Sequence, residues 1–307
     1  EPQVQIDQRF SGMPRKRVDF LLTCRDRADC KPMVVEMDGW AYHATTMAED
    51  LECRLAMIRT GKLRVWTLGW PDLDSKTTIH PVNPFAPGAF GPQFEGVLGV
   101  LWSRSEFAAH QEHQTATERF RSGSSLDALL AALRDPKASA GIGAAIMLRL
   151  AIGNAPRALD ELPGASDLGD DARSFLAEAP LLGAVQHPHL HLYFGAPAGP
   201  PARAFAATDE YRVVLGCDAD PESAEVSATL RSAILGFWRL LNLLQDLPGL
   251  HATHPALDAH GSPVPGAGDS VIADAAWGEL FELIDDRGVA VLTALQAAGA
   301  PLPDVIG

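Results

Sequence analysis

Two acidic residues separated by a single residue stand in the apolar stretch VVEMDGWAYHA, where Glu36 and Asp38 precede His43. Alternate side chains of a β-strand point to the same face, so Glu36 and Asp38 would share a face. Val34 and Val35 precede Glu36 in an apolar run, and a charge in such a run needs a partner. Carboxylates followed by an imidazole could bind a cation or transfer a proton.

A third acid, Asp19, lies in the preceding apolar stretch, RVDFLL. If the polar turn over residues 25–32 pairs the two stretches as neighbouring strands, Asp19 can lie beside Glu36. Carboxylates this close raise one another's pKa unless a cation lies between them. A hard divalent cation with oxygen ligands would meet this need, and Mg²⁺ is the usual one in phosphate chemistry.

The elements that would position these acids follow the order β-β-β-α-β. A capping box at Thr46 and Glu49 and a glycine at Gly61 mark the ends of the helix. Apolar residues recur along it at helical spacing. We expect strands at residues 4–7, 17–24, 33–40 and 62–70, and the helix at residues 45–61.

The motif E-x-D-G-x3-H, followed by D-x3-R and G-x-x-V-x-x-L, resembles the PD-(D/E)XK, or restriction-endonuclease-like, nuclease superfamily. The most similar branch is the Vsr-like one, and the resemblance covers about residues 15–73. The same block of residues is also similar to the C-terminal region of large bacterial DEAD/DEAH-box helicases, some of which are linked to phage defence. There a DGW-x-(F/Y)-HA block follows the motor.

The resemblance implies a role for each residue. Asp19 and Glu36 would bind Mg²⁺ or Mn²⁺, and the carbonyl of Met37 could complete the coordination shell. Asp38 would assist, and His43 would act as a general base or orient the attacking water. The superfamily's motif lysine should stand two residues after the second acid, where this sequence has Asp38. The Vsr-like branch tolerates loss of that lysine.

The rest of the chain reads as a mostly helical α+β module. We expect a restriction-endonuclease-like α/β module at 1–80, a Pro- and Gly-rich linker at 81–92, and the second module at 93–307. The second module is expected to contain helices at about 124–134, 141–152, 170–179, 221–247 and 274–298, strands at 189–195 and 211–217, and a loop at 249–269.

The net charge of −14 is unevenly distributed along the chain. Residues 1–80 hold 12 Lys and Arg against 12 Asp and Glu, and residues 81–307 hold 13 against 27. An acidic second half argues against a broad nucleic-acid surface there. A phosphate-facing patch is plausible in the first segment alone, at residues 15–17 and at residues 25, 27 and 31. DNA is therefore expected to bind through residues 1–80.

Other chemistry is less strongly indicated. His187, His189 and His191 would fall on one strand face and could bind zinc, although no acid or cysteine is near them in the sequence and a half-exposed edge strand is the favoured explanation. Cys24 and Cys30 could touch across a hairpin turn, but the four cysteines lack CxxC spacing and favour reduced thiols. Trp40, Trp66 and Trp70 are expected to pack the sheet rather than to stack on bases.

These features predict a metal-dependent DNA endonuclease-like module of a larger bacterial DNA-processing protein, with a helicase motor elsewhere in the polypeptide. The alternatives are an inactive nuclease fold that binds DNA or docks a protein, and a protein–protein scaffold. No Walker A motif or DEAD/DEAH box occurs, so this segment should not hydrolyse ATP. No membrane span or signal peptide is expected, which favours a cytoplasmic protein.

Overall fold

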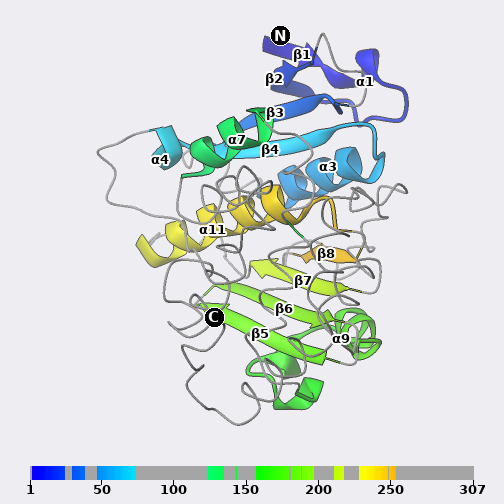
Figure 1. Cartoon of the computed structure of the whole chain (residues 1–307), viewed down its shortest axis with the longest axis vertical. Helices are drawn as coiled ribbons and strands as arrows, with labels where there is room; N and C mark the ends of the chain where they lie inside the picture. Colours follow the sequence, from blue (N-terminus) through cyan, green and yellow to red (C-terminus); the bar gives the residue numbers. More distant parts are fainter. Residues whose placement is uncertain are drawn as a thin grey trace, which may run out of the picture.

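The computed structural model shows a mixed α/β chain with two four-stranded sheets (Figure 1). It describes residues 2–24, 30–38, 47–73, 124–134, 143, 157–179, 181–187, 189–196, 211–217, 228–247 and 249–253. Among these residues, no helix is long and apolar enough to cross a membrane.

The first unit, residues 2–73, has the strand order β1-β2-β3-β4. The β1/β2 and β2/β3 pairs are antiparallel, and the β3/β4 pair is parallel. The predicted order β-β-β-α-β is confirmed, except that a short helix begins at Ile6, where the first strand was expected to continue. The elements are β1 (Pro2–Gln5), α1 (Ile6–Arg9), β2 (Arg17–Leu22), β3 (Met33–Asp38), α3 (Met47–Arg59), β4 (Arg64–Gly69) and α4 (Trp70–Leu73).

Helix α3 connects the parallel strands β3 and β4, as a crossover between parallel strands requires. Met47, Leu51, Leu55 and Ile58 recur at helical spacing and are all buried. Gly61 follows the helix with φ of +65°, a left-handed conformation that glycine adopts without steric cost, and its N–H donates to the Ile58 carbonyl at 2.9 Å. The apolar stripe thus fixes α3 on one face of the sheet.

The second unit repeats this topology. Its strand order is β5-β6-β7-β8, with two antiparallel pairs followed by a parallel pair, β7/β8, joined through α11. The elements of the remaining chain are α7 (Ser125–Arg134), η3 (Leu159–Glu161), η4 (Ala165–Asp167), α9 (Asp170–Ala177), β5 (Leu181–His187), β6 (Leu190–Ala196), β7 (Arg212–Cys217), α11 (Ala228–Leu244) and β8 (Leu250–Thr253).

Two strands of the second unit were not predicted. Strand β5, LLGAVQH, contains the small residues Gly183 and Ala184, which weaken its β signal. Strand β8, LHAT, lies inside the segment that was expected to be a loop, and that prediction is wrong for residues 250–253. The expected helices at 141–152 and 274–298 and the linker at 81–92 fall outside the described residues, apart from Gly143.

Helix α11 lies between the two sheets (Figure 1) and is buried almost all round. It packs on β6 and β7 of its own unit and also against β4 of the first unit. One hydrophobic cluster therefore contains residues of both units, including Leu55 of α3, Phe237 of α11 and Leu215 of β7. The positions predicted for the module boundaries, residues 80 and 93, lie outside the described residues.

Two side-chain amides, one at the end of α11 and one in the turn that follows it, close the edge of the first sheet. Asn242 Oδ1 accepts a hydrogen bond from the Thr67 N–H, and its Nδ2 donates to the Thr67 carbonyl, both at 2.8 Å. Gln245 makes the same pair of bonds with Val65, at 2.8 and 2.7 Å. An edge strand otherwise exposes unpaired backbone groups, so two amides three residues apart replace the missing neighbour strand.

Candidate functional site

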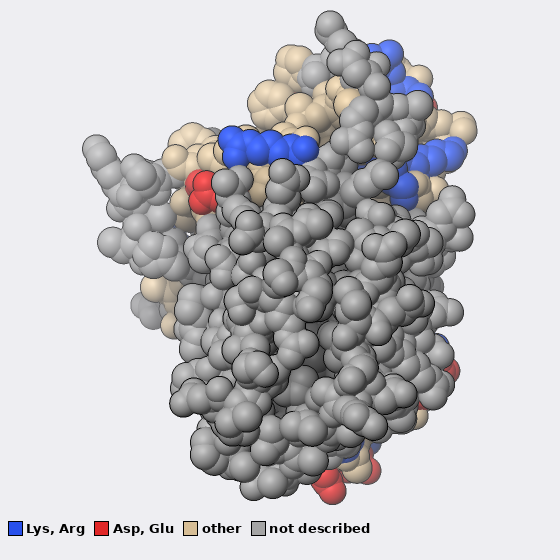
Figure 2. Space-filling view, in the orientation of Figure 1, with Lys and Arg blue, Asp and Glu red and all other residues tan. Residues whose placement is uncertain are grey.

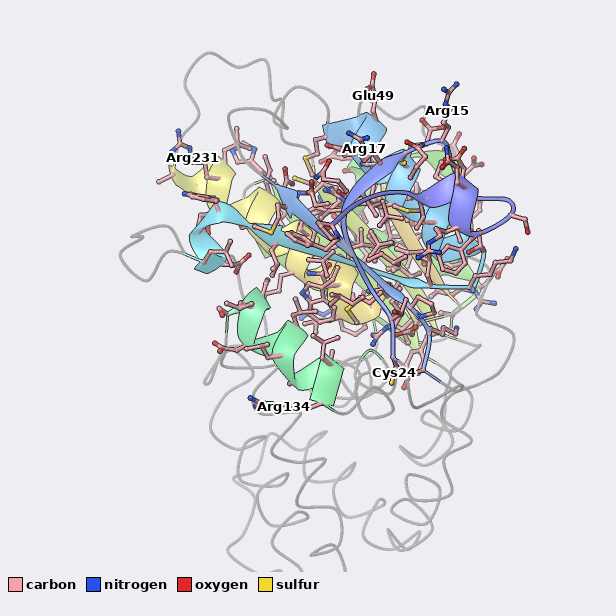
Figure 3. All side chains as sticks on the ribbon, turned by 90° about the horizontal axis from the view of Figure 1, so that it is seen from above. Arg15, Arg17, Cys24, Glu49, Arg134 and Arg231 are labelled. Carbon is pink, nitrogen blue, oxygen red and sulfur yellow. The ribbon has the colours of Figure 1, made fainter. Side chains whose placement is uncertain are left out.

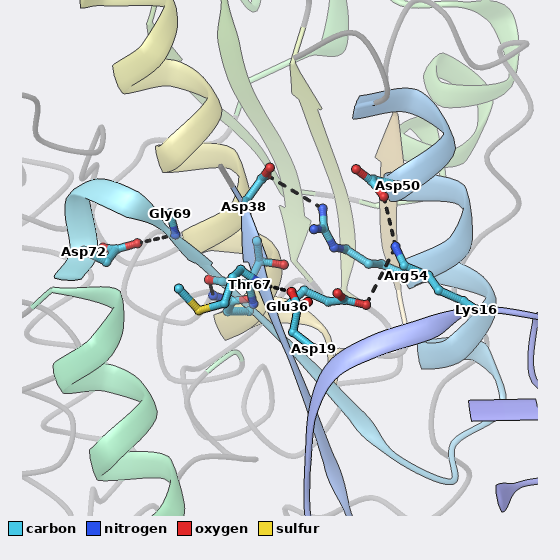
Figure 4. A network of polar contacts seen from close by, with 11 residues as sticks. Lys16, Asp19, Glu36, Asp38, Asp50, Arg54, Thr67, Gly69 and Asp72 are labelled. Atoms are coloured by element: carbon cyan, nitrogen blue, oxygen red, sulfur yellow. Dashed lines mark hydrogen bonds and ion pairs between the residues drawn. The ribbon is translucent and has the colours of Figure 1, made fainter. Parts of the chain in front are cut away.

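The acids singled out from the sequence converge on the α3 side of the first sheet (Figure 4). β2 contributes Asp19, and β3 contributes Glu36 and Asp38. Helix α3 adds Asp50 and Arg54, and Lys16 reaches in from the segment before β2. We call these six residues the acid cluster.

Asp19 and Glu36 occupy adjacent strands. Phe20 pairs with Val35 in the antiparallel register, which brings the next residues, Asp19 and Glu36, to neighbouring positions. Asp19 Oδ2 accepts the Met37 N–H at 2.8 Å, and Oδ1 accepts Gln3 Nε2 at 3.0 Å. A carboxylate oxygen has more than one lone pair, so each oxygen of Asp19 can accept a further ligand.

Glu36 is the most buried acid of the cluster, with 5% of its surface exposed. Among the described residues, its Oε1 has no hydrogen-bond partner. The Lys16 ammonium lies 3.7 Å from Oε1, beyond hydrogen-bond distance, and 2.9 Å from Asp50 Oδ1. A buried carboxylate oxygen without a donor is costly, so Glu36 Oε1 is an open acceptor position.

Arg54 is the second cation of the cluster and is 1% exposed. Its Nη1 lies 4.0 Å from Asp38 Oδ2, while its guanidinium carbon lies 4.0 Å from the centroid of the Trp238 ring on α11. Asp38, the residue at the position of the superfamily's motif lysine, therefore faces an arginine from α3.

The ionisation of the cluster is shifted by burial and by the neighbouring charges. Burial raises the pKa of Glu36 above its usual value; the Lys16 and Arg54 cations oppose this shift, and Asp19 and Asp50 add to it. Burial lowers the pKa of Lys16, but Glu36 and Asp50 outweigh that effect and leave the Lys16 pKa raised. The ammonium form of Lys16 is thus the stable one in this site.

The sequence reasoning missed Lys16 as a member of the cluster and Trp238 as the ring that Arg54 contacts, and it treated Asp50 and Arg54 as an ordinary helix pair. Lys16 was assigned to a phosphate-facing patch, yet its ammonium turns inward to Asp50 while Arg15 and Arg17 are exposed (Figure 3). Alternation along the extended segment gives the signal that could have separated Lys16 from both arginines. His43 lies outside the described residues.

The cluster was tested as a divalent cation site. In the described part of the chain, no three His, Cys, Asp or Glu side chains are arranged so that they could hold a metal ion. Mg²⁺, however, commonly takes only one or two carboxylates and completes its shell with water and substrate phosphate. Asp19 and Glu36, with the open Oε1 of Glu36, meet that smaller requirement.

Among its described side chains, the second unit has an apolar surface where the first unit has the acid cluster. On the face covered by its own crossover helix α11, the paired strands β6 and β7 carry Leu192 opposite Leu215, both buried. In the first unit, the face covered by α3 carries Asp19 and Glu36. The same topology thus supports a polar face in one unit and an apolar core in the other.

The three histidines of HPHLH do not share one strand, so that prediction is wrong. His187 ends β5 and His191 belongs to β6, while His189 lies in the turn between them with φ of +69°. The turn between β5 and β6 therefore takes His189 out of the strand, and the three histidines do not line one strand face.

The tryptophans have different environments. Trp66 is buried at 1% exposure, as predicted, and donates its indole N–H to the Ser125 carbonyl at 3.2 Å. Trp70 is 66% exposed, so the expectation that it packs the sheet is wrong. Trp40 lies outside the described residues.

The basic residues on either side of Lys16 in the sequence are exposed. In the view of Figure 2, the Lys and Arg atoms of the described residues gather toward the upper part of the molecule, at the first unit. Arg15 and Arg17 are exposed there.

The chain matches no protein-family model, and comparisons with curated proteins and with solved structures find no significant match.

Proposed function

We propose that the first unit is a divalent-cation-dependent nuclease-like module that hydrolyses DNA phosphodiesters within a larger DNA-processing protein. The observation that carries this proposal is Glu36 Oε1, a buried carboxylate oxygen with no hydrogen-bond partner, on a strand beside Asp19. The restriction-endonuclease-like order β-β-β-α-β and the convergence of both acids on the α3 face support it.

Asp19 and Glu36 are the residues that would hold Mg²⁺ or Mn²⁺. When bound, the ion would polarise a phosphate oxygen and lower the pKa of a coordinated water. The Met37 N–H orients Asp19, and Lys16 offsets part of the charge of Glu36 and Asp50. We assign the proton transfer to His43, which would act as a general base or orient the attacking water.

A nicking assay on supercoiled plasmid DNA with Mg²⁺ or Mn²⁺ tests the proposal. The wild-type chain is expected to nick the plasmid, and Glu36→Gln should abolish nicking. Glu49→Gln is the matched control, because Glu49 is exposed on the outer side of α3 (Figure 3) and loses the same charge. Absence of nicking by the wild-type chain with both ions would refute the enzymatic proposal for this segment.

A second candidate is an inactive nuclease fold that binds DNA or docks a protein. One observation favours it: the Lys16 ammonium lies between Glu36 and Asp50, where it already neutralises two acids without a metal. A DNA mobility-shift titration in EDTA at several salt concentrations separates these roles. Arg15→Ala and Arg17→Ala should each weaken binding and reduce the salt slope by about 1. If no shift occurs at low salt, protein docking is favoured.

The resemblance to the C-terminal regions of DEAD/DEAH-box helicases supports a place beside a motor in a longer polypeptide. The chain itself contains no Walker A motif, so the motor would have to lie outside residues 1–307.

A further inference from the structure

Two of the four cysteines lie outside the hydrophobic core. Cys217 is buried in the main hydrophobic cluster, and Cys53 packs against that cluster. Buried thiols of this kind act as small apolar side chains. Cys24, by contrast, is exposed at the end of β2 (Figure 3), and Cys30 is half-buried. Neither belongs to a hydrophobic cluster of the described residues, so packing does not explain these two thiols.

The register of the β2–β3 hairpin brings Cys24 and Cys30 close together. The antiparallel ladder reaches Leu22, which lies opposite Met33. The same register, continued by two residues on each strand, places Cys24 opposite Lys31. Cys30 directly precedes Lys31 in the chain, so the two cysteines are neighbours across the open end of the hairpin.

The separation that this register implies suits a disulfide bond. Opposed α-carbons of an antiparallel pair lie about 5 Å apart, and one step along a strand adds about 3.3 Å at right angles to that direction. The α-carbons of Cys24 and Cys30 are therefore expected about 6 Å apart, within the roughly 4.4–6.8 Å that a disulfide spans. Cys30 lies in a bend, so strand alternation does not fix the direction of its thiol. Both cysteines are free thiols in this structure, and residues 25–29 between them lie outside the described residues.

The different exposure of the two thiols sets the order of an exchange reaction. A thiolate must be accessible to attack an incoming disulfide, which makes Cys24 the attacking group. With glutathione disulfide, the Cys24 thiolate forms a mixed disulfide and expels one glutathione thiolate. The Cys30 thiolate then attacks the Cys24 sulfur and expels the second. Two cysteine thiols are oxidised to one disulfide, one glutathione disulfide is reduced to two thiols, and the two cysteine protons pass to these products.

We propose that Cys24 and Cys30 form a reversible thiol–disulfide exchange site whose oxidant is a low-molecular-weight disulfide such as glutathione disulfide. In the oxidised form, the bond closes the turn end of the β2–β3 hairpin. Among the described residues, the ladder has no pair beyond Leu22 and Met33 at that end, so the bond would fix a part of the hairpin that backbone pairing does not. The inference is independent of the proposed nuclease activity, because it involves neither DNA nor a metal ion.

The test is equilibration of the full chain in glutathione redox buffers, followed by acid quenching, alkylation of the remaining thiols and mass spectrometry of tryptic peptides. Oxidation should join the peptide of residues 18–25, which contains Cys24, to the peptide that begins at Ala28 and contains both Cys30 and Cys53. Cys53→Ser is the matched control and should leave this link intact, whereas Cys30→Ser should abolish it.

The Cys30→Ser variant also reports the order of the two steps. A second thiol on a short linker acts at an effective concentration in the millimolar range, so with about 0.1 mM reduced glutathione it should resolve the mixed disulfide in the wild-type chain. Cys30→Ser should therefore accumulate at least about tenfold more of the glutathione adduct on Cys24. A wild-type chain that stays fully reduced, or that stops at the mixed disulfide, would overturn the proposal.

The same equilibration in concentrated urea separates a site formed by the fold from two cysteines that are merely close in sequence. In the unfolded chain the C-x5-C loop still closes, at the effective concentration of a flexible linker. The folded hairpin should raise the equilibrium constant for the disulfide at least about tenfold above the unfolded value, and by linkage oxidation would stabilise the folded chain by the same factor. An equal or smaller constant in the folded chain would contradict the proposal.

Discussion

Asn242 on α11 binds both backbone polar groups of Thr67 on β4, with one hydrogen bond in each direction at 2.8 Å. Gln245 repeats this with Val65, so a helix supplies the edge strand with the partners that a neighbouring strand would give. Truncation of Asn242 to alanine would leave two buried backbone groups unsatisfied. Each such group costs about 1–3 kcal/mol.

Asn242→Ala and Gln245→Ala are therefore each expected to lower the free energy of unfolding by about 2–6 kcal/mol in a urea titration. Asn242→Asp retains an acceptor but loses the donor and should cost less than the alanine variant only while the Thr67 N–H stays bonded. Gln8→Ala is the matched control, because Gln8 is exposed. Equal stability of Gln245→Ala and Gln8→Ala would show that the amide pairs contribute little.

Glu36 is expected to reduce stability at neutral pH. Burial raises its pKa, so the folded state holds a proton that the unfolded chain has already released. The free energy of unfolding therefore falls as the pH rises from the ordinary pKa of glutamate through the raised pKa of Glu36. Glu36→Gln should remove this loss and stabilise the protein at pH 7 by on the order of 1 kcal/mol. Thermal unfolding of both proteins between pH 4 and 8 measures this difference in stability. A Glu36→Gln variant that is less stable than the wild-type chain at pH 7 would contradict the prediction.

Two tryptophans four residues apart should respond very differently to substitution. Trp66 is 1% exposed and hydrogen-bonded to Ser125, whereas Trp70 is 66% exposed. Trp66→Ala is expected to cost about 3–5 kcal/mol, as large-to-small changes in a core do. Trp70→Ala should change the free energy of unfolding by less than about 0.5 kcal/mol. Chemical unfolding of both variants provides the comparison, with each serving as the other's control.

The first unit was predictable because its elements carry strong local signals. The stripe of α3, the glycine at position 61 and the apolar runs around Asp19 and Glu36 each identify an element without reference to the rest of the chain. Alternation along paired strands was then sufficient to bring Asp19 to Glu36. These inferences use only contacts that are local or one hairpin apart.

The other parts of the site depend on contacts that have no local signal. Trp238 lies far along the chain from Arg54, and the stripe on α11 was interpreted as ordinary core. Strand β5 contains small residues, and strand β8 has only four residues, so both depend on pairing with their neighbours in the sheet. Such tertiary pairing overrides weak propensity, which the sequence alone does not reveal.

His251 on β8 should make the free energy of unfolding depend on pH in the acidic range. It is 3% exposed, and neither ring nitrogen has a hydrogen-bond partner in the described part of the chain. Burial lowers its pKa, Arg59 lowers it further, and Asp171 opposes the shift. The folded state therefore keeps His251 neutral at pH values where the unfolded chain takes up a proton. This contribution is fully present above pH about 6.5 and is lost as the pH falls toward the lowered pKa.

His251→Phe is expected to remove this loss, because phenylalanine cannot take up a proton and can still pack against the ring of Phe175, 5.9 Å away. The measurement is the free energy of unfolding at pH 5 and pH 8. The wild-type chain should lose up to about 1.4 kcal/mol more than the variant for each pH unit within the window. Equal pH dependence of the two proteins would show that His251 is not buried in its neutral form.

Lys16 should compete with a divalent cation for the acid cluster. Its ammonium lies 2.9 Å from Asp50 Oδ1 and 3.7 Å from Glu36 Oε1, so a metal ion on Glu36 would face a neighbouring positive charge. Lys16→Met removes that charge while keeping an unbranched side chain. Because charges about 4 Å apart near a protein surface interact by several kcal/mol before screening, Mn²⁺ should bind the variant at least about tenfold more tightly. Calorimetric titration with Mn²⁺ measures the affinities of the wild-type chain and of Lys16→Met.

Lys62→Met is the matched control, since the Lys62 ammonium donates a hydrogen bond to the Ser11 carbonyl, outside the cluster. Weaker Mn²⁺ binding by Lys16→Met would instead indicate that Lys16 orients the acids for the ion. Equal affinity in all three proteins would place any bound ion away from Glu36.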